Sequence, residues 1–510
     1  MKTEPAGFDT GRTSLTIRFR DRVVLAVLVI AAIESVLYYG DYWFLGGHPK
    51  HLALFVILSY AVFRGPVRSI FSWGFFQFLR IPGSRPLTQK VSVDVLTTAM
   101  PGEPYDMFDA TLRAIQRMSY SHATYLLDGG NDERLKTLCK ELDVIHVDCQ
   151  GIPGAKAGKI NHCLKNHSRG EFLLIMDPDH RPEPDFLERA LPSFQDRKVG
   201  FVQVVQAYYN ERKNVVSHGA SEQTYGFYGP LMMSLDGLDM AIAIGANCLF
   251  RRAALDSIGG HAVHLAEDAC TSLRLHGEGW KSRYVPYRAS YGLVPEDLQT
   301  FFKQQLKWAS GMFDLFIHEY PKWFRRLNLQ AKLYYFFAGT HYLNGLAGFI
   351  TVAAPILLLF FQVYAVEMPI TGFLLHVTPY ILLSFAINMY VQRWYSDKQE
   401  HGIPWRSMLL EKGTWHIYAL SFIYMLARKK VPYLPTPKTG AGRTSLALIL
   451  PHIVGVGLSL AAVAFPFFFY HRIDSGTRLM MLFALMNIVA LTPVIVWGLK
   501  NPENDKRGGA

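Results

Sequence analysis

Residues 171–180 read EFLLIMDPDH, an apolar run that stops at two carboxylates, Asp177 and Asp179, one residue apart. A short apolar run of this kind is typical of a buried β-strand. Alternate side chains of an extended segment point the same way, so both carboxylates can face one spot where the strand ends. Such a pair is commonly resolved by a divalent cation, and hard oxygen ligands favour Mg²⁺ or Mn²⁺. The alternative is an Asp-rich turn that merely ends the strand and caps the next helix, and the pair alone leaves both open.

Strand and helix patterns alternate on either side of this run. Strand patterns lie at 91–99, 123–128, 143–148, 171–177 and 199–207, and helical periodicity lies at 106–118, 132–142, 156–166 and 185–194. Such alternation predicts a mostly parallel α/β sheet with helices on its faces, in which ligands bind beyond the carboxyl ends of the strands. Asp128 and Asp177 both stand at such ends.

Long apolar runs flank this α/β region. Six of them reach the roughly 20 residues that a membrane-spanning helix needs, at about 23–45, 51–72, 340–365, 370–391, 446–470 and 478–499. The first is too long for a signal-peptide core and is expected to stay as an anchor. Arg64 and Arg68 interrupt the second, so we expect it either to span or to end near Phe63 and continue as an interfacial helix.

The charge distribution points to a membrane surface as the partner. The chain has 52 Lys and Arg against 41 Asp and Glu, a formal net charge of +11. The basic residues crowd beside the apolar runs, as the positive-inside bias predicts, and this favours membrane lipids over nucleic acid. The α/β region then lies on the cytoplasmic side. The five cysteines are odd in number and lack CxxC spacing, which indicates buried thiols rather than disulfides or a zinc site.

Two later segments place polar residues in helical patterns. Glu267 and Asp268 open an amphipathic helix, where first-turn acids are also favoured by the helix dipole alone. In FFKQQLKWASG (301–311), Gln304, Lys307 and Trp308 fall at i, i+3 and i+4 and share one helix face. An amide, a cation and an indole on one stripe suit a diphosphate and a sugar ring better than an apolar core.

The ordered motifs resemble those of processive, inverting family-2 glycosyltransferases of the cellulose, curdlan, chitin and hyaluronan synthase type, over nearly the whole chain. They are LTTAMPGEP (96–104), LLDGG (126–130), KAGKIN (156–161), DPDHRP (177–182), VQVVQAYYN (202–210), GANCLFRR (245–252), AED (266–268), QQLKW (304–308) and YLPTPK (433–438). The last is similar to the gating loop of bacterial cellulose synthase. The resemblance implies a cytoplasmic GT-A (Rossmann-like) α/β domain inserted between transmembrane helices 2 and 3 of a six-helix membrane region, in a bacterial inner membrane.

The same resemblance implies roles for individual residues. Asp268 would be the general base, and Asp177 and Asp179 would hold Mg²⁺ or Mn²⁺. Thr98, Glu103, Asp128 and Lys156 would bind the nucleotide, with Asp128 at uracil and Lys156 at the diphosphate. Gln304, Lys307, Trp308 and Glu267 would serve the acceptor and the diphosphate, and Thr436 and Lys438 would belong to the gating loop.

Three positions depart from the family's pattern. Leu127 stands where a second aspartate is usual, Ala266 replaces a threonine, and Lys307 replaces an arginine. Arginine grips a diphosphate with a planar fork whereas lysine offers a point charge, so the last exchange is not chemically neutral.

The resemblance also sets the expected organisation. The expected parts are an N-terminal segment with spans one and two (1–80), the glycosyltransferase domain (81–330), spans three and four (331–392), a cytoplasmic interfacial segment (393–445), and spans five and six with the C-terminal tail (446–510). The chain ends soon after the sixth span, so no C-terminal regulatory domain is expected.

The expected function is polymerisation of a nucleotide sugar into a β-linked polysaccharide that leaves through the membrane. UDP-glucose is the favoured donor because GANCLFRR and QQLKWASG look closer to glucan synthases than to hyaluronan synthases. The growing polysaccharide is the acceptor, and accessory export subunits are possible partners. Two alternatives stay open: a transferase that adds one sugar to a polyprenyl phosphate, and an inactive membrane scaffold or export subunit.

Overall fold

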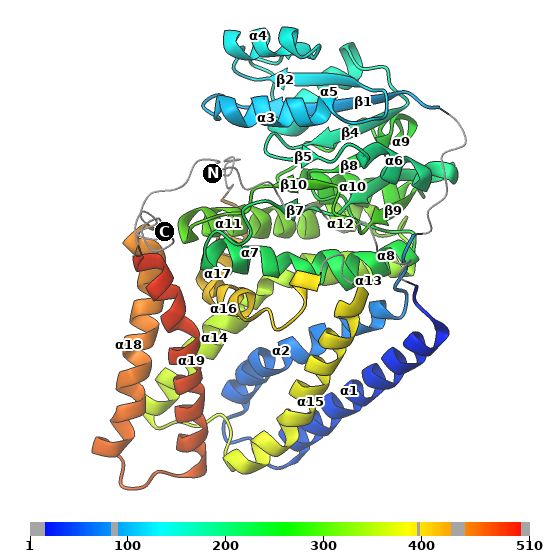
Figure 1. Cartoon of the computed structure of the whole chain (residues 1–510). Coiled ribbons are helices and arrows are strands. Elements are labelled where there is room, and N and C mark those ends of the chain that lie inside the picture. Colours follow the sequence, from blue (N-terminus) through cyan, green and yellow to red (C-terminus); the bar gives the residue numbers. More distant parts are fainter. Residues whose placement is uncertain (1–15, 83–89, 395–397, 430–443, 501–510) are drawn as a thin grey trace.

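The computed structural model describes residues 16–82, 90–394, 398–429 and 444–500. An α/β domain lies at one end of the molecule and long helices lie at the other, with a layer of shorter helices between them (Figure 1). The carboxyl ends of the central strands and the interfacial helices together position the site described below.

The α/β domain is built on a seven-stranded mixed sheet with the order β3-β2-β1-β4-β8-β6-β9. Its strands are β1 (Val93–Ala99), β2 (Ala123–Asp128), β3 (Ile145–Asp148), β4 (Phe172–Met176), β6 (Val199–Val204), β8 (Cys248–Arg251) and β9 (Lys281–Val285). The five predicted strands are confirmed. The prediction missed β8 and β9, and β8 runs antiparallel to both of its neighbours, β4 and β6.

Helices cover both faces of the sheet, and for this reason every residue of β1 and β4 is buried. They are α3 (Tyr105–Gln116), α4 (Glu133–Glu141), α5 (Ala155–Asn166), α6 (Phe186–Ala190), α9 (Arg252–Ser257) and α10 (Glu267–Gly277). The α3 helix shows the local logic, because Phe108, Leu112 and Ile115 recur at helical spacing and are all buried. The fourth predicted helix ends early: after α6 the chain tightens into a 3₁₀ turn, η1 (Leu191–Gln195), where Pro192 has no backbone N–H to donate.

A small second sheet lies beside the carboxyl end of β4. It pairs β5 (Arg181–Pro182), β10 (Ser290–Gly292) and β7 (Ala207–Tyr208) in the order β5-β10-β7. The backbone N–H of Leu293, just after β10, donates to Asp179 Oδ2 at 3.2 Å. This hydrogen bond and the pairing of β5 with β10 hold the DPD segment against the small sheet.

Shorter helices form the layer between the α/β domain and the long helices (Figure 1). They are α7 (Val215–Gly226), η2 (Phe227–Leu231), α8 (Met232–Gly237), α11 (Leu298–Asp314), η3 (Leu315–Glu319), α12 (Tyr320–Trp323), α16 (Trp405–Gly413) and α17 (Trp415–Leu426). The α11 helix packs on α17, and α7 packs on α16. Residues from distant parts of the sequence thus meet under the site.

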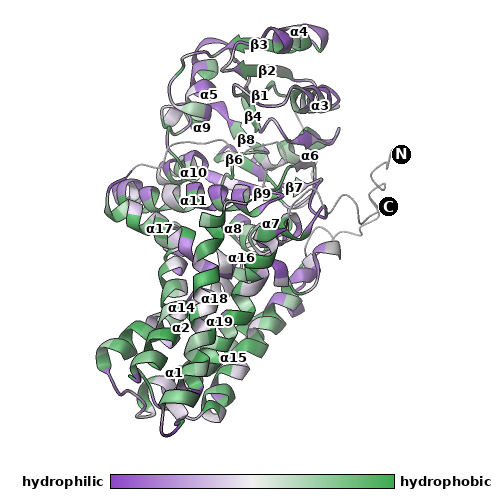
Figure 2. Ribbon diagram, turned by 90° about the vertical axis from the view of Figure 1, so that its left-hand side faces the viewer, coloured by the Kyte–Doolittle hydropathy of each residue, from purple (hydrophilic) through white to green (hydrophobic). Residues whose placement is uncertain are grey.

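Within the part of the chain that the structure describes, six helices are long and apolar enough to cross a membrane, as predicted. They are α1 (Phe19–Leu45), α2 (Leu52–Phe76), the pair α13 (Leu329–Gly339) and α14 (Asn344–Phe361), α15 (Ile370–Val391), α18 (Leu446–Phe469) and α19 (Ser475–Leu499). Figure 2 shows that their residues are mostly hydrophobic. Large apolar side chains such as Phe468 (80% exposed) and Val489 (72% exposed) face outward, as lipid-facing residues do.

The second span is one continuous helix. The α2 helix runs unbroken from Leu52 to Phe76, so the chain stays helical past Phe63, and where the membrane-spanning part ends stays a prediction. Arg64 Nε donates to Asn344 Oδ1 at 2.8 Å and Arg68 Nη1 donates to the Phe337 carbonyl at 3.0 Å. Both arginines therefore hydrogen-bond to residues near the break between α13 and α14. The third apolar helix begins at Leu329, earlier than the predicted residue 340.

The cysteines behave as predicted. All five, Cys139, Cys149, Cys163, Cys248 and Cys270, are buried and free.

Candidate active site

A pocket opens at the carboxyl ends of β1 and β2. It is lined by Met100, Pro101, Gly102, Glu103, Pro104, Tyr105, Phe108, Asp128, Gly130, Asp132, Arg134 and Leu135. Two of the predicted nucleotide-binding residues, Glu103 and Asp128, are in this set. Glu103 Oε2 accepts the backbone N–H of Met100 at 2.9 Å, which fixes the turn after β1. Thr98 lies in β1 itself and is buried.

Asp128 holds the turn after β2. Its Oδ1 accepts from Gly130 N at 2.8 Å, and its Oδ2 accepts from Asp132 N at 2.7 Å. His146 Nε2 on β3 lies 3.0 Å from the same Oδ2, a partner that the sequence did not single out. With a side chain that is 2% exposed, Asp128 shapes the pocket through this turn, and its contact with uracil stays a prediction.

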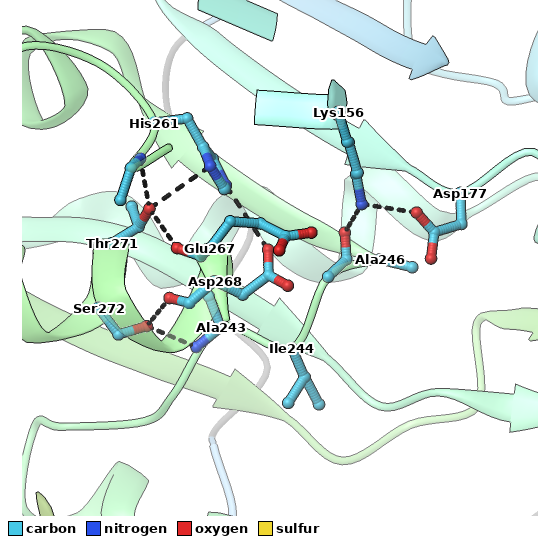
Figure 3. A network of polar contacts seen from close by, with 12 residues as sticks. Lys156, Asp177, Ala243, Ile244, Ala246, His261, Glu267, Asp268, Thr271 and Ser272 are labelled. Atoms are coloured by element: carbon cyan, nitrogen blue, oxygen red, sulfur yellow. Dashed lines mark hydrogen bonds and ion pairs between the residues drawn. The ribbon is translucent and has the colours of Figure 1, made fainter. Parts of the chain in front are cut away.

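Lys156 connects three segments at the start of α5. Its Nζ donates to Asp177 Oδ1 and to the Gly245 carbonyl, both at 2.6 Å (Figure 3). Burial by itself lowers the pKa of Lys156, but the carboxylates of Asp177, Asp268 and Glu267 outweigh it and raise the pKa above the usual range. Lys156 therefore brings a positive charge to the point where the segments after β4 and before β8 approach α10.

The DPD segment and the residue after it form an acidic corner. Asp177, Asp179 and His180 each offer a ligand atom, and these atoms lie within 4.8 Å of one another. Asp179 is buried, and its Oδ1 lies 3.4 Å from His180 Nδ1. Two carboxylates and an imidazole fit a divalent cation that prefers oxygen ligands and tolerates nitrogen.

The predicted base lies in the first turn of α10. Thr271 Oγ1 donates to the Glu267 carbonyl at 2.7 Å and Ser272 Oγ donates to the Asp268 carbonyl at 2.9 Å, which holds this turn. Burial, and next the charge of Asp268, raise the pKa of Glu267. Asp268 has a side chain that is 20% exposed and faces Lys156 across the site (Figure 3).

The α11 helix brings the QQLKW residues to the same place. Burial lowers the pKa of Lys307, although the carboxylates of Glu267 and Asp268 oppose that shift. Trp308 is 40% exposed, as a platform for a ligand would be. Gln304 is half-buried, whereas its neighbour Gln305 is buried and accepts a hydrogen bond from Tyr418 Oη on α17 at 2.6 Å. The sequence prediction named Gln304 and missed Gln305.

Ala266 also gains a local explanation. A Cβ added at Gly311 on α11 would lie 3.0 Å from Ala266 Cβ, so the two segments already approach closely. The small side chain at 266 suits this contact between α11 and the start of α10. The predicted gating-loop residues Thr436 and Lys438 lie outside the described residues.

Comparison with known proteins agrees with this geometry. A family model described as glycosyl transferase family group 2 matches residues 172–391. The chain is 32% identical over 244 residues to a cellulose synthase catalytic subunit of Komagataeibacter sucrofermentans, covering 46% of this chain and 32% of that protein. A second such subunit, from Xanthomonas axonopodis pv. citri, is 31% identical over 287 residues, covering 53% of this chain and 39% of that protein.

The chain is similar to cellulose synthase catalytic subunits over about half of its length.

The chain has a GT-A fold joined to apolar helices, as predicted. A mannosyltransferase from Pyrobaculum calidifontis, solved in complex with GDP-Man and Mn²⁺, shares the fold with a TM-score of 0.51 at 16% identity. That match covers 74% of this chain and 100% of the mannosyltransferase. The first two cellulose synthase alignments cover about a third of the length of those relatives.

Proposed function

We propose that this glycosyltransferase polymerises UDP-glucose into a β-linked glucan, one sugar at a time, and passes the chain through its membrane helices. The observation that carries the proposal is the convergence of Lys156, Asp177, Asp268 and Lys307 from four separate elements at one edge of the sheet, with Trp308 exposed beside them. The likeness to cellulose synthase catalytic subunits supports a polymer product over a single transfer to a polyprenyl phosphate.

The charged residues have separate roles in the proposed reaction. Displacement of UDP from the anomeric carbon builds negative charge on the leaving diphosphate, and Lys156 and Lys307 supply cations toward it. The acceptor hydroxyl loses a proton as it attacks, and the Asp268 carboxylate accepts that proton. Trp308 stacks its flat face against the terminal acceptor sugar. Burial and the charge of Asp268 raise the pKa of Glu267, and the charge of Lys307 opposes that shift.

We propose that Asp177 and Asp179, with His180 beside them, hold Mg²⁺ or Mn²⁺. The donor set and the Mn²⁺ in the mannosyltransferase of the same fold support this assignment. A bound divalent cation would offset charge on the leaving diphosphate. The Asp177 carboxylate also pairs with Lys156.

Polar side chains continue from α11 toward the membrane helices and suggest the route of the product. Tyr418, bonded to Gln305, lies with its ring 5.0 Å from that of Tyr342, and His341 Nδ1 lies 3.0 Å from Arg68 Nη2. Hydroxyl-rich glycans need such polar and aromatic partners within a membrane. The distribution of basic residues supports a cytoplasmic site in a bacterial inner membrane. Accessory export subunits would then act on the far side.

The test uses the full chain in lipid nanodiscs, given UDP-glucose, GDP-mannose or UDP-N-acetylglucosamine with Mg²⁺ or Mn²⁺. We expect long labelled polymer from UDP-glucose alone. Asp268→Asn should slow it by about 10²–10⁴-fold, the contribution of a general base, while UDP still binds. A lipid-soluble monosaccharide product would contradict the proposal, and so would a folded, UDP-binding protein that releases nucleotide from none of the donors.

The metal assignment has a separate test in thermal unfolding. UDP should raise the unfolding temperature with Mn²⁺ or Mg²⁺ and much less with EDTA, because a ligand stabilises only the state that binds it. Asp177→Asn should remove the metal-dependent part of this rise in unfolding temperature. Asp196→Asn, in the turn before β6, should keep it. Equal stabilisation with and without metal would overturn the assignment.

A further inference from the structure

His261 lies directly behind Asp268, and no sequence motif drew attention to it. It precedes α10 in the loop that follows Gly259 and Gly260, and its side chain is fully buried. Its Nε2 lies 3.6 Å from Asp268 Oδ1 and has no hydrogen-bond partner there (Figure 3). A buried imidazole nitrogen aimed at the predicted base calls for an explanation, because buried polar atoms are normally paired.

The loop is fixed so that the imidazole has little freedom. Asn161 on α5 brackets its backbone: His261 N donates to Asn161 Oδ1 at 2.7 Å, and Asn161 Nδ2 donates to the His261 carbonyl at 2.8 Å. The ring of Phe250 on β8 packs edge-to-face with the imidazole at 5.8 Å between centroids. Two elements of the α/β domain therefore hold His261 at the back of Asp268.

The hydrogen-bond pattern decides which nitrogen carries a proton. Thr271 Oγ1 lies 3.5 Å from His261 Nδ1, but it already donates to the Glu267 carbonyl at 2.7 Å and accepts from Ala262 N at 2.9 Å. A hydroxyl has one proton, so this one gives none to Nδ1. A neutral ring protonated only at Nδ1 would point the Nε2 lone pair at a carboxylate oxygen, which is repulsive. An Nε2–H avoids that repulsion.

We propose that His261 is a positioning residue for Asp268: its Nε2–H donates to Oδ1 and leaves Oδ2 to accept the proton of the acceptor hydroxyl. This inference rests on the proposed function, in which Asp268 is the base. Asp268 Oδ2 lies on the side of Gly245 and Lys156. A Cβ added at Gly245 would lie 3.1 Å from Asp268 Oδ2 and 4.0 Å from Lys156 Nζ. The separation of 3.6 Å shortens when the acceptor is bound, as catalytic hydrogen bonds commonly do.

Other charged and titratable groups face this pair from every side. Glu267 adjoins Asp268 on α10, Lys156 faces it from α5, Lys307 from α11 and Cys248 from β8. None of these lies within hydrogen-bonding reach of His261 among the described contacts, and His264 of the same loop turns away to Asp314, with Nε2 2.6 Å from Oδ2. His261 is therefore the donor available to Oδ1, and His264 is its matched control.

The experiment compares His261→Gln, His261→Phe and His264→Gln in nanodiscs. His261→Phe should lower kcat for sugar transfer by roughly tenfold or more, less than the 10²–10⁴-fold of a base itself. KM for UDP-glucose and the affinity for UDP should stay unchanged. The acid limb of kcat/KM should move to higher pH, because the ionised carboxylate loses a donor. His261→Gln, whose amide can still donate, should recover part of the rate, and His264→Gln should match the unaltered protein.

The outcomes separate the two proposals. If Asp268→Asn is inactive and both His261 variants keep the rate and pH profile of the unaltered protein, the inference fails and the proposed function stands. If Asp268→Asn is as active as the unaltered protein, the proposed function itself fails. Should neither His261 variant fold, as judged by UDP binding, histidine-selective ¹⁵N spectra of the unaltered chain decide. They should show one histidine protonated at Nε2 whose signal shifts in Asp268→Asn, and no such signal would overturn the inference.

Discussion

At the scale of single residues, the site gathers Lys156 and Lys307 against four carboxylates, and the surroundings shift the pKa values of the two lysines in opposite directions. Lys156 is held between Asp177 and the Gly245 carbonyl and keeps a raised pKa. Lys307 lies on α11 with a pKa that burial lowers against the pull of Glu267 and Asp268. The exchange of arginine for Lys307 within the QQLKW motif therefore makes one of the two cations sensitive to alkaline pH.

Lys307→Arg should extend activity to higher pH. A lysine whose pKa is lowered loses its proton, and its charge toward the diphosphate, at a lower pH than an ordinary lysine, whereas a guanidinium keeps its charge. The alkaline limb of kcat/KM for UDP-glucose should therefore move upward in Lys307→Arg. Lys303→Arg, exposed on the same helix, serves as the control and should leave the limb in place. If the alkaline limb of kcat/KM does not move in Lys307→Arg, a group other than Lys307 is responsible for that limb.

At the scale of elements, the turn before β8 ties the antiparallel strand to the base on α10. Gly245 has φ +94°, a conformation that favours glycine, and its carbonyl accepts from Lys156. Gly245→Ala should cost about 1–3 kcal/mol in stability and also lower kcat, because its Cβ would meet Asp268 Oδ2 at 3.1 Å. Thermal unfolding and turnover together measure the two effects.

Gly279→Ala is the matched control for that variant. Gly279 also has positive φ, +84°, but nothing lies within 4 Å of its added Cβ. It should lose stability with kcat preserved. Equal kcat in the two variants would show that the Gly245 turn does not position Asp268.

A second element-scale prediction concerns the join between α2 and the break in the third span. Arg68 donates to the Phe337 carbonyl and lies 3.0 Å from His341 Nδ1, with its guanidinium 4.0 Å over the Phe337 ring. Arg68→Gln should lower the unfolding temperature in detergent, since each buried group left unpaired costs about 1–3 kcal/mol. UDP affinity should not change. Arg478→Gln, an exposed arginine near the start of α19, should show no comparable loss.

At the scale of the whole molecule, the catalytic domain sits over the membrane helices with α11 between them (Figure 1). Trp308→Ala tests whether stacking of the acceptor sugar on the Trp308 indole is needed to make a polymer. UDP affinity should persist, because we propose that Trp308 contacts the acceptor and not the nucleotide. Product length should fall sharply, since stacking on an aromatic ring would hold the growing end between transfers. Trp308→Phe should recover part of the length. Full-length product from Trp308→Ala, sized by gel filtration of labelled glycan, would remove the platform from the mechanism.

Much of this architecture was readable in advance, and the misses have physical causes. Apolar periodicity located five strands, four helices and six long apolar helices because those signals are local. The prediction missed β8 because GANCLFRR is a short apolar run. Its antiparallel place between β4 and β6 depends on pairing with residues 45 to 79 positions earlier in the sequence. The partners of Arg64 and Arg68 on α2 could not be read from the sequence, because they lie near the α13–α14 break, 280 and 269 positions later in the chain.

The sequence by itself determined which chemical groups the chain could bring to a site: the DPD carboxylates, the acids that open α10 and the amide, cation and indole stripe of α11. It did so because strand alternation and helix spacing are properties of neighbouring residues. Only the tertiary structure decided that Lys156 joins Asp177 to the Gly245 carbonyl, that Gln305 rather than Gln304 bonds Tyr418, and that His261 lies behind Asp268. Those contacts join elements far apart in sequence, and packing and the pairing of buried polar groups select them, neither of which leaves a local pattern.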